Sequence, residues 1–175
     1  WRTINGEECS GYWPAGTAAF HVNGAIAHAV VELADVIDDP HFEREVGVEL
    51  LVETARLWRS LGHHDRAGSF RIDGITGPDE YTAVVDNNVY TNLLAQENLR
   101  VAALAAERHP ACAAELGVDA EEIAGWRSAA DAMVIPCDAE RGLHPQSEGF
   151  LEHELWDFEQ TSADEYPLFK SFPYF

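Results

Sequence analysis

Apolar residues recur every three or four positions through most of this 175-residue chain, which is the period of a helix that buries one face. The pattern predicts four helices: Thr17 to Ile37, Pro40 to Leu61, Asn87 to Arg108, and one between Asp119 and Pro136. The side chains expected to line a core are Val22, Ile26, Val30, Leu33 and Ile37; Phe42, Val46, Leu50, Leu57 and Leu61; Leu93, Leu94, Leu99 and Leu104; and Ile123, Trp126 and Met133. The predicted fold class is therefore all-α, with helix packed on helix and little β structure.

Signals for helix ends support these ranges. Asp39 is expected to cap the second helix, with Pro40 at its first position and Gly62 as its stop. Asp119 and Glu122 have the spacing of a capping box before the fourth helix.

The connections between the predicted helices are long. Residues 63–86 lack the helical period and turn repeatedly at glycines, and loops of this length in a compact domain tend to be functional. Within them, 70–75 and 82–85 are candidates for short β segments. The chain from Cys137 onward is acidic and aromatic, and we expect one short turn near Ser162–Tyr166.

The charge balance excludes several classes of partner. The chain has 31 Asp and Glu against 11 Lys and Arg, for a net charge of −20. Nucleic acids and anionic membrane surfaces both select basic proteins, so we expect neither as a partner. No apolar run approaches the roughly 18 residues of a membrane span, and no secretory pattern opens the chain, so a cytoplasmic protein is expected. Cys9, Cys112 and Cys137 form neither a disulfide framework nor a metal motif.

Two adjacent carboxylates follow a stiff turn. Gly77-Pro78 fixes the backbone, and Asp79, Glu80 and Tyr81 come next. A carboxyl group beside an aromatic ring and apolar residues is partly desolvated, which raises its pKa and lets it serve as a general acid toward a sugar oxygen. An alternative of equal weight is that one of the two carboxylates caps the turn that follows.

Aromatic residues alternate with carboxylates in two predicted loops. The first holds Trp1, Glu7 and Trp13, and the second spans residues 148–157. A sugar presents apolar C–H faces and hydroxyl edges, so its site needs rings for stacking and polar groups for the hydroxyls. Both loops are therefore candidates for a carbohydrate site.

Other aromatic and histidine residues favour structural roles. Trp58 and Trp126 lie on helical stripes, where core packing is the expected role. Residues 63–65, His-His-Asp, invite a metal site, but adjacent histidines chelate one ion poorly and a solvated loop is favoured. His21 is expected to be a hydrogen-bonded pocket or core residue, and no metal site is predicted.

Five blocks of the sequence resemble the family 65 glycoside hydrolases, in the same order. Gly-Pro-Asp-Glu-Tyr at 77–81 and Asp-Asn-Asn-Val-Tyr-Thr-Asn-Leu at 86–93 are the most specific. The blocks at 1–8, 146–150 and 172–175 match as well, so the resemblance covers essentially the whole chain. The family consists of inverting disaccharide phosphorylases that act on maltose, trehalose, kojibiose and related α-glucosides.

The resemblance implies the central part of an (α/α)6 toroid, with residues 1–175 as a fragment of a single catalytic domain and no internal domain boundary. By position, Glu80 matches the general acid of the family. It protonates the departing glycosidic oxygen while inorganic phosphate attacks the anomeric carbon from the opposite face, which yields β-glucose 1-phosphate and a released sugar.

The implied partners are an α-linked disaccharide and inorganic phosphate as co-substrate, with no cofactor and no metal. The candidate substrate-binding residues are Trp1, Glu7, Trp13, His21, Asp79, Tyr81 and Asn88. The resemblance also implies a homodimer formed through the full-length protein.

The chain departs from the family pattern in two respects. Ala25 stands where the family usually has Asp, and the family's phosphate-binding segment corresponds to sequence beyond Phe175, so the isolated chain is expected to be inactive. Two alternative functions stay open. One is an inverting hydrolase like the acid trehalases, with a second carboxylate that activates water. The other is a non-catalytic helical domain that binds carbohydrate or acts as a scaffold.

Overall fold

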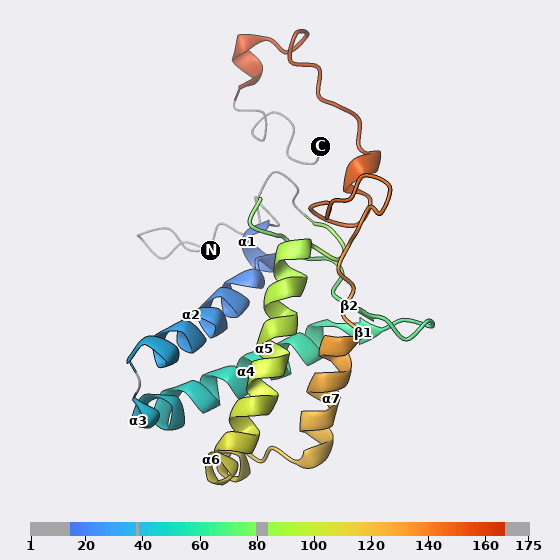
Figure 1. Ribbon diagram of the computed structural model, residues 1–175. Coiled ribbons are helices and arrows are strands. Elements are labelled where there is room, and N and C mark those ends of the chain that lie inside the picture. The colour runs from blue at the N-terminus through green and yellow to red at the C-terminus, as the bar shows by residue number, and fades with distance from the viewer. Residues whose placement is uncertain (1–14, 38, 80–83, 167–175) are drawn as a thin grey trace.

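The computed structural model describes residues 15–37, 39–79 and 84–166. Most of this part of the chain is helical (Figure 1). The helices are α1 (Ala15–Ala18), α2 (His21–Ile37), α3 (Pro40–Phe42), the π-helical η1 (Glu43–Gly47), α4 (Val48–Leu61), α5 (Val89–Arg108), α6 (Pro110–Glu115) and α7 (Ala120–Asp131), followed by the 3-10 turns η2 (Phe150–Glu152) and η3 (Ala163–Glu165). Two short strands, β1 (His63–His64) and β2 (Phe70–Arg71), pair antiparallel.

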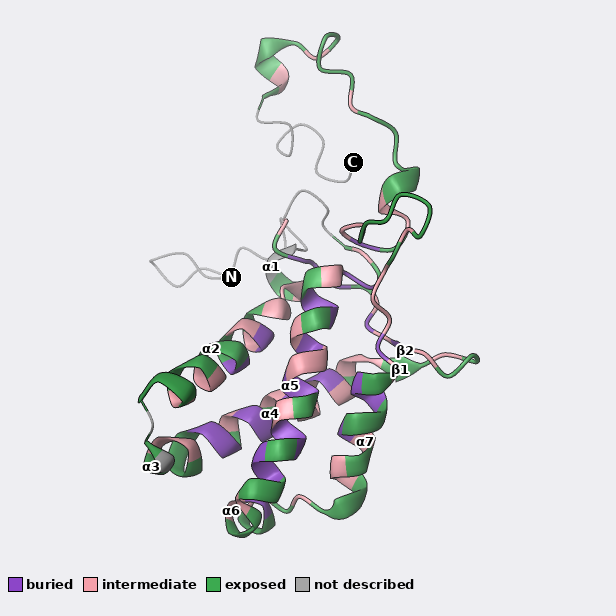
Figure 2. Ribbon diagram, viewed as in Figure 1, coloured by how far each residue is buried: buried purple, intermediate pink, exposed green. Residues whose placement is uncertain are grey.

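Helix α5 is the centre of the bundle and packs against α2, α4 and α7. It can approach three neighbours closely because alanines occupy most of its inner surface, with Ala95, Ala102, Ala103 and Ala106 all buried. Figure 2 shows that buried residues concentrate on α4 and α5. The core of the described chain is therefore built on small residues of α5 that receive larger side chains from its neighbours.

Two of the predicted core stripes are largely wrong. On α2, Val22, Ile26, Leu33 and Ile37 are 42–50% exposed, and only Val30 of that stripe packs against the core. The buried side of α2 carries Gly24 and Ala27 instead. A Cβ at Gly24 would lie 2.7 Å from Leu94 Cβ, so the helices approach at a glycine and the larger residues turn outward. On α5, Leu93 and Leu104 are likewise exposed, whereas Leu99 is buried as predicted.

The predicted stripe of the second helix is displaced as well. The fully buried residues of α4 are Val48, Leu51, Val52, Ala55 and Trp58, while Val46 is half exposed. The helix predicted over 40–61 includes the five-residue π segment η1, which rotates the following helix relative to a regular α register. Leu50, Leu57 and Leu61 lie at the margin of the core, beside the buried face of α4.

The two tryptophans predicted to lie in the core do so, with exposed fractions of 0% for Trp58 and 1% for Trp126. The indole Nε1 of Trp58 donates to Asn98 Oδ1 at 2.8 Å, and Asn98 Nδ2 donates to Leu51 O at 3.2 Å. This buried polar pair connects α4 to α5. It satisfies groups that would otherwise be costly to bury.

The predicted helix ends are mostly confirmed. Gly62 follows the last residue of α4, and Asp119 caps α7 through a bond from Glu122 N to its Oδ1 at 2.8 Å. The Glu122 carboxylate binds Arg56 on α4, with Nε–Oε1 at 2.7 Å and Nη2–Oε2 at 2.9 Å. Helix α7 ends at Asp131, before Pro136, and α6 was not predicted.

The strands are shorter than the predicted β segments, and the first strand begins at His63, before either of them. His63 and His64 were expected in a solvated loop; both are exposed, yet they form β1 and pair with Arg71 and Phe70 respectively. Of the candidate segment 70–75 only Phe70–Arg71 is a strand, and Ile75 forms an isolated bridge with Val85.

The segment after α7 leaves the helices and continues as a long connection through η2 and η3, where the predicted turn near residue 162 is confirmed (Figure 1). Among the helices described, none has the length and apolar character needed to cross a membrane.

Candidate functional site

Three segments meet at the N-terminal end of α5, and the third is distant in sequence from the other two. They are residues 72–79, residues 84–88 and residues 146–148. Their backbones are joined by bonds from Asn87 N to Ile72 O at 2.9 Å, from Glu148 N to Asp86 O at 3.1 Å and from Val89 N to Gln146 O at 3.0 Å. The turn that carries the predicted general acid thus begins on a framework of loops fastened to a helix end.

Asn87 is the hub of this framework. It is fully buried and has φ +48°, a left-handed conformation that Asn tolerates better than most residues. Its Oδ1 accepts from Ile72 N at 3.3 Å, and its Nδ2 donates to Asp73 at 3.2 Å and to Glu148 at 2.8 Å. One side chain therefore ties all three segments together.

Glu148 serves this framework as an ionised group. Hydrogen bonds from Arg71 and then Asn87 hold the pKa of the Glu148 carboxyl below its ordinary range. A carboxylate with a lowered pKa is a poor proton donor near neutral pH. Glu148 was one of the carboxylates in the predicted sugar loop, and its bonds give it a structural role.

Asn88, a predicted substrate-binding residue, caps α5. Its Oδ1 accepts from Thr91 N at 3.0 Å and from Thr91 Oγ1 at 3.1 Å, and its Nδ2 donates to Gln146 O at 3.1 Å. The side chain is also packed under the turn, because a Cβ at Gly77 would lie only 2.3 Å from Asn88 Nδ2. Asn88 is 1% exposed, so its described bonds support the loops, and its predicted contact with substrate stays a prediction.

Asp79 is half-buried at the far end of this turn. Its Oδ2 accepts a hydrogen bond from Gln146 Nε2 at 2.8 Å. The predicted acid Glu80 and its neighbour Tyr81 lie outside the described residues, as do Trp1, Glu7 and Trp13.

His21 opens α2 and lies against the same turn. Its Nδ1 is 3.1 Å from Thr76 O, and its ring meets the edge of Tyr90 with centroids 6.1 Å apart. A carbonyl oxygen only accepts, so Nδ1 carries the proton in this bond and the neutral ring keeps its lone pair on Nε2. The prediction of a hydrogen-bonded histidine is confirmed, and the bond fastens α2 to the turn three residues before Asp79.

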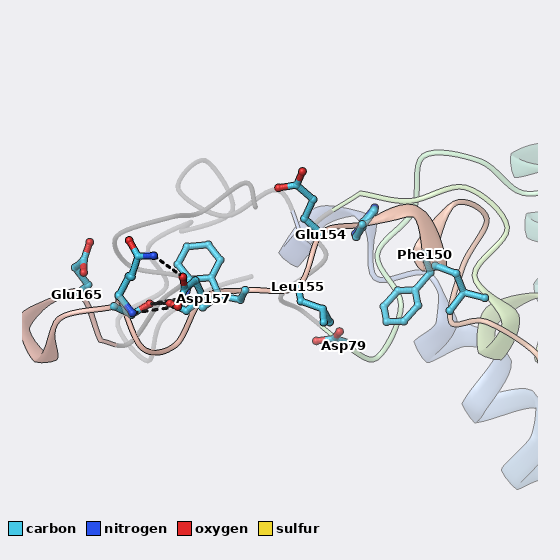
Figure 3. A pocket seen from close by; sticks show the side chains of 11 residues that line it. Asp79, Phe150, Glu154, Leu155, Asp157 and Glu165 are labelled. Atoms are coloured by element: carbon cyan, nitrogen blue, oxygen red, sulfur yellow. Dashed lines mark hydrogen bonds between the residues drawn. The ribbon is translucent and has the colours of Figure 1, made fainter.

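An open cavity of about 1010 Å³ lies beside Asp79 and the segment 150–165. Its other lining residues are Phe150, Leu151, His153, Glu154, Leu155, Trp156, Asp157, Gln160, Thr161 and Glu165. Figure 3 shows Asp79 between Phe150 and Asp157 in this view. The predicted aromatic and acidic loop therefore does line a cavity, together with the residue that precedes the predicted acid.

The cavity has the composition that a carbohydrate site needs. Phe150 and Trp156 supply rings, while Glu154, Asp157 and Glu165 supply acceptors for hydroxyl groups. Some acceptors are already oriented: Asp157 Oδ2 accepts from Gln160 Nε2 at 2.7 Å. Within the described segments, no group of three or more His, Cys, Asp and Glu side chains is arranged to hold a metal ion.

Three residues of the framework were not singled out by the sequence. Arg71, Asn87 and Gln146 act through contacts with residues 14 to 77 positions away, which spacing does not reveal. Asn87 and Gln146 do lie in two of the blocks that resemble the family, and this was the one signal available.

Comparisons with known proteins agree with the resemblance. All residues, 1–175, match the family described as glycosyl hydrolase family 65 central catalytic domain. An uncharacterized glycosyl hydrolase of Mycobacterium leprae is 57% identical over 169 residues, which are 97% of this chain and 21% of that protein. An alpha,alpha-trehalose phosphorylase of Geobacillus stearothermophilus is 47% identical over 176 residues, covering 96% of this chain and 23% of the relative.

A solved structure provisionally assigned as a kojibiose phosphorylase, from the human microbiome, superposes with a TM-score of 0.83 and is 26% identical in sequence. The match covers 98% of this chain and 26% of the chain in that structure. The chain thus spans about a fifth to a quarter of the length of the proteins it matches. Mostly helical and with little sheet, it has the predicted fold class. The chain belongs to glycosyl hydrolase family 65, whose central catalytic domain is an (α/α)6 barrel.

Proposed function

We propose that the complete protein carrying this chain cleaves an α-linked glucose disaccharide with inorganic phosphate, with inversion, and that Glu80 is the general acid. The observation that carries the proposal is the position of Asp79, which lines the cavity of about 1010 Å³ and directly precedes Glu80. The trehalose phosphorylase that shares 47% identity supports the same reaction class.

In this reaction the Glu80 carboxylic acid donates its proton to the glycosidic oxygen as the C–O bond to the anomeric carbon breaks. A phosphate oxygen forms the new bond from the opposite face, and the products are β-glucose 1-phosphate and the free sugar. Phosphate is already an anion, so no second carboxylate is required to activate it, whereas water would require one. A positioned general acid accelerates such a step by about 10²–10⁴-fold.

Some of the candidate binding residues are supported by contacts in the structure, and others are proposed from the sequence alone. Asp79 lines the cavity, and His21 is bonded to the same turn, so we propose both near the bound sugar. Trp1, Glu7, Trp13 and Tyr81 are proposed as binding residues from the sequence alone. We propose that Asn88 contributes by holding the turn.

Residues 1–175 are proposed to be part of one catalytic domain, with the phosphate contacts supplied from elsewhere in the complete protein and with a homodimer as its assembly. Trehalose is the first disaccharide to test, since the trehalose phosphorylase relative shares 47% identity with the chain. Maltose and kojibiose follow, because neither linkage is distinguished by the described residues.

The experiment incubates the complete protein with each disaccharide, with and without phosphate, and identifies the products by NMR. The proposal predicts release of β-glucose 1-phosphate that depends on phosphate, and its near loss in Glu80→Gln. Glu140→Gln, the same change at an exposed site, is the matched control and should be fully active. Phosphate-independent release of glucose would indicate a hydrolase, and no turnover of any α-glucoside would indicate a binding or scaffold domain; either result rejects the proposal.

A further inference from the structure

Gln146 connects the turn that precedes Glu80 to the N-terminal end of α5. Its backbone oxygen accepts from Val89 N at 3.0 Å and from Asn88 Nδ2 at 3.1 Å, while its side-chain Nε2 donates to Asp79 Oδ2 at 2.8 Å. The same residue is therefore anchored by its main chain and holds the cavity-lining carboxylate with its side chain.

The residues next to Gln146 are themselves held by burial and hydrogen bonds. The next residue, Ser147, is 1% exposed, and Glu148 is bound by Arg71 and Asn87. On the other side of the turn, Gly77 packs directly on Asn88, the residue that also bonds Gln146. The turn is thus held at two residues. Gly77 packs on Asn88, which caps α5, and Asp79 is bonded to Gln146, which is itself bonded to Asn88.

We propose that Gln146 is a positioning residue that holds the Asp79 carboxylate and so fixes the backbone from which the chain continues to Glu80. The proposal rests on the proposed role of Glu80. Consecutive Cα atoms are about 3.8 Å apart, so fixing Asp79 restricts the space that the next side chain can reach. A misplacement of about 1 Å in a catalytic group costs on the order of 10²-fold in rate.

The test places a second carboxylate opposite Asp79 in the complete enzyme. Gln146→Glu removes the donor and adds charge repulsion, and we expect kcat to fall about 10- to 100-fold, because proton donation is used only in the transition state. KM should rise by a smaller factor, because Asp79 is itself proposed to lie near the bound sugar. The paired variant Asp79→Asn with Gln146→Glu reverses donor and acceptor and restores the hydrogen bond. It should recover most of the lost kcat, a coupling that two independent structural roles would not produce.

Gln96→Glu is the matched control. Gln96 is half-buried, donates to Ala130 O at 2.8 Å and is not among the residues that line the cavity, so the same change there should lower the melting temperature and leave kcat unchanged. If Gln146→Glu does not fold, Gln146→Met removes the donor without adding charge and should show the same loss of kcat.

The outcomes separate this proposal from the proposed function. A wild-type protein that does not process disaccharides, or an active Glu80→Gln variant, overturns both. If wild type and Glu80→Gln behave as proposed, but Gln146→Glu keeps kcat within about twofold or the paired variant recovers nothing, the role of Gln146 alone is rejected.

Discussion

Gly77→Ala should damage both the stability and the activity of the complete protein. The new Cβ would lie 2.3 Å from Asn88 Nδ2 and 2.7 Å from its Cγ, about 1 Å inside ordinary contact, and the side chain it meets is buried and fully engaged in the α5 cap. Overpacking of this kind costs about 1–3 kcal/mol, and loss of the cap costs about 1 kcal/mol more. We therefore expect a loss of about 2–4 kcal/mol together with a shift of the turn that leads to Asp79.

Chemical denaturation gives the free energy of unfolding, and steady-state assays give kcat. Gly125→Ala is the matched control: nothing lies within 4 Å of its added Cβ, and the site is inside α7, so this change should stabilise by about 0.5–1 kcal/mol and leave kcat unchanged. Combining Gly77→Ala with Asn88→Gly opens the required space. The double variant should therefore lose less stability than the sum of the losses of the two single variants. The reasoning is refuted if Gly77→Ala has the same free energy of unfolding and the same kcat as wild type. It is also refuted if the stability loss of the double variant equals the sum of the two single losses.

Two further predictions concern buried and ionised groups. Trp58→Phe removes the indole donor and leaves Asn98 Oδ1 without its 2.8 Å bond in the core, so unfolding measurements should show a loss of about 1–3 kcal/mol, and a change below about 0.5 kcal/mol would contradict it. Glu148→Gln tests pH dependence. The pKa of Glu148 is lowered in the folded state by Arg71 and Asn87, so its stabilisation is present above the unfolded pKa of about 4.3 and is lost as pH falls through the folded pKa. The variant should be less stable than wild type at pH 7, and the difference should shrink below about pH 4; an equal difference at both pH values is inconsistent with this account.

Local signals predicted the helix ends well, because the groups involved are close in sequence. Asp119 caps α7 through Glu122 N, three residues away, and Gly62 follows α4 directly. The buried faces were harder to predict. Val22 and Ile26 follow a clear apolar period, but Gly24 brings α2 close to its neighbours and sets the opposite face inward. Since the chain spans about a fifth of its relatives and the family domain is a barrel of helices, we expect this exposed apolar face to pack against helices outside the chain.

The candidate site was predictable only where residue type alone suggests a chemistry. Rings and carboxylates in 148–157 suggested a sugar-binding loop, and several of them line the cavity. The supporting contacts were not predictable, because Asp79 and Gln146 are 67 residues apart and only the fold brings them within 2.8 Å. Asn88 illustrates the same limit: its place in a recognisable block suggested substrate, whereas its described bonds cap a helix and fix a turn.

The most direct measurement of the central claim compares Glu80→Gln on two substrates that differ in their need for a proton. The sugar released from a disaccharide would depart as an alkoxide unless its glycosidic oxygen is protonated, whereas the fluoride of α-glucosyl fluoride departs as a stable anion. With phosphate present, the account predicts that Glu80→Gln loses about 10²–10⁴-fold in kcat on the disaccharide but less than about tenfold on the fluoride. Equal losses on both substrates, or full activity on the disaccharide, would contradict the assignment of Glu80 as the proton donor.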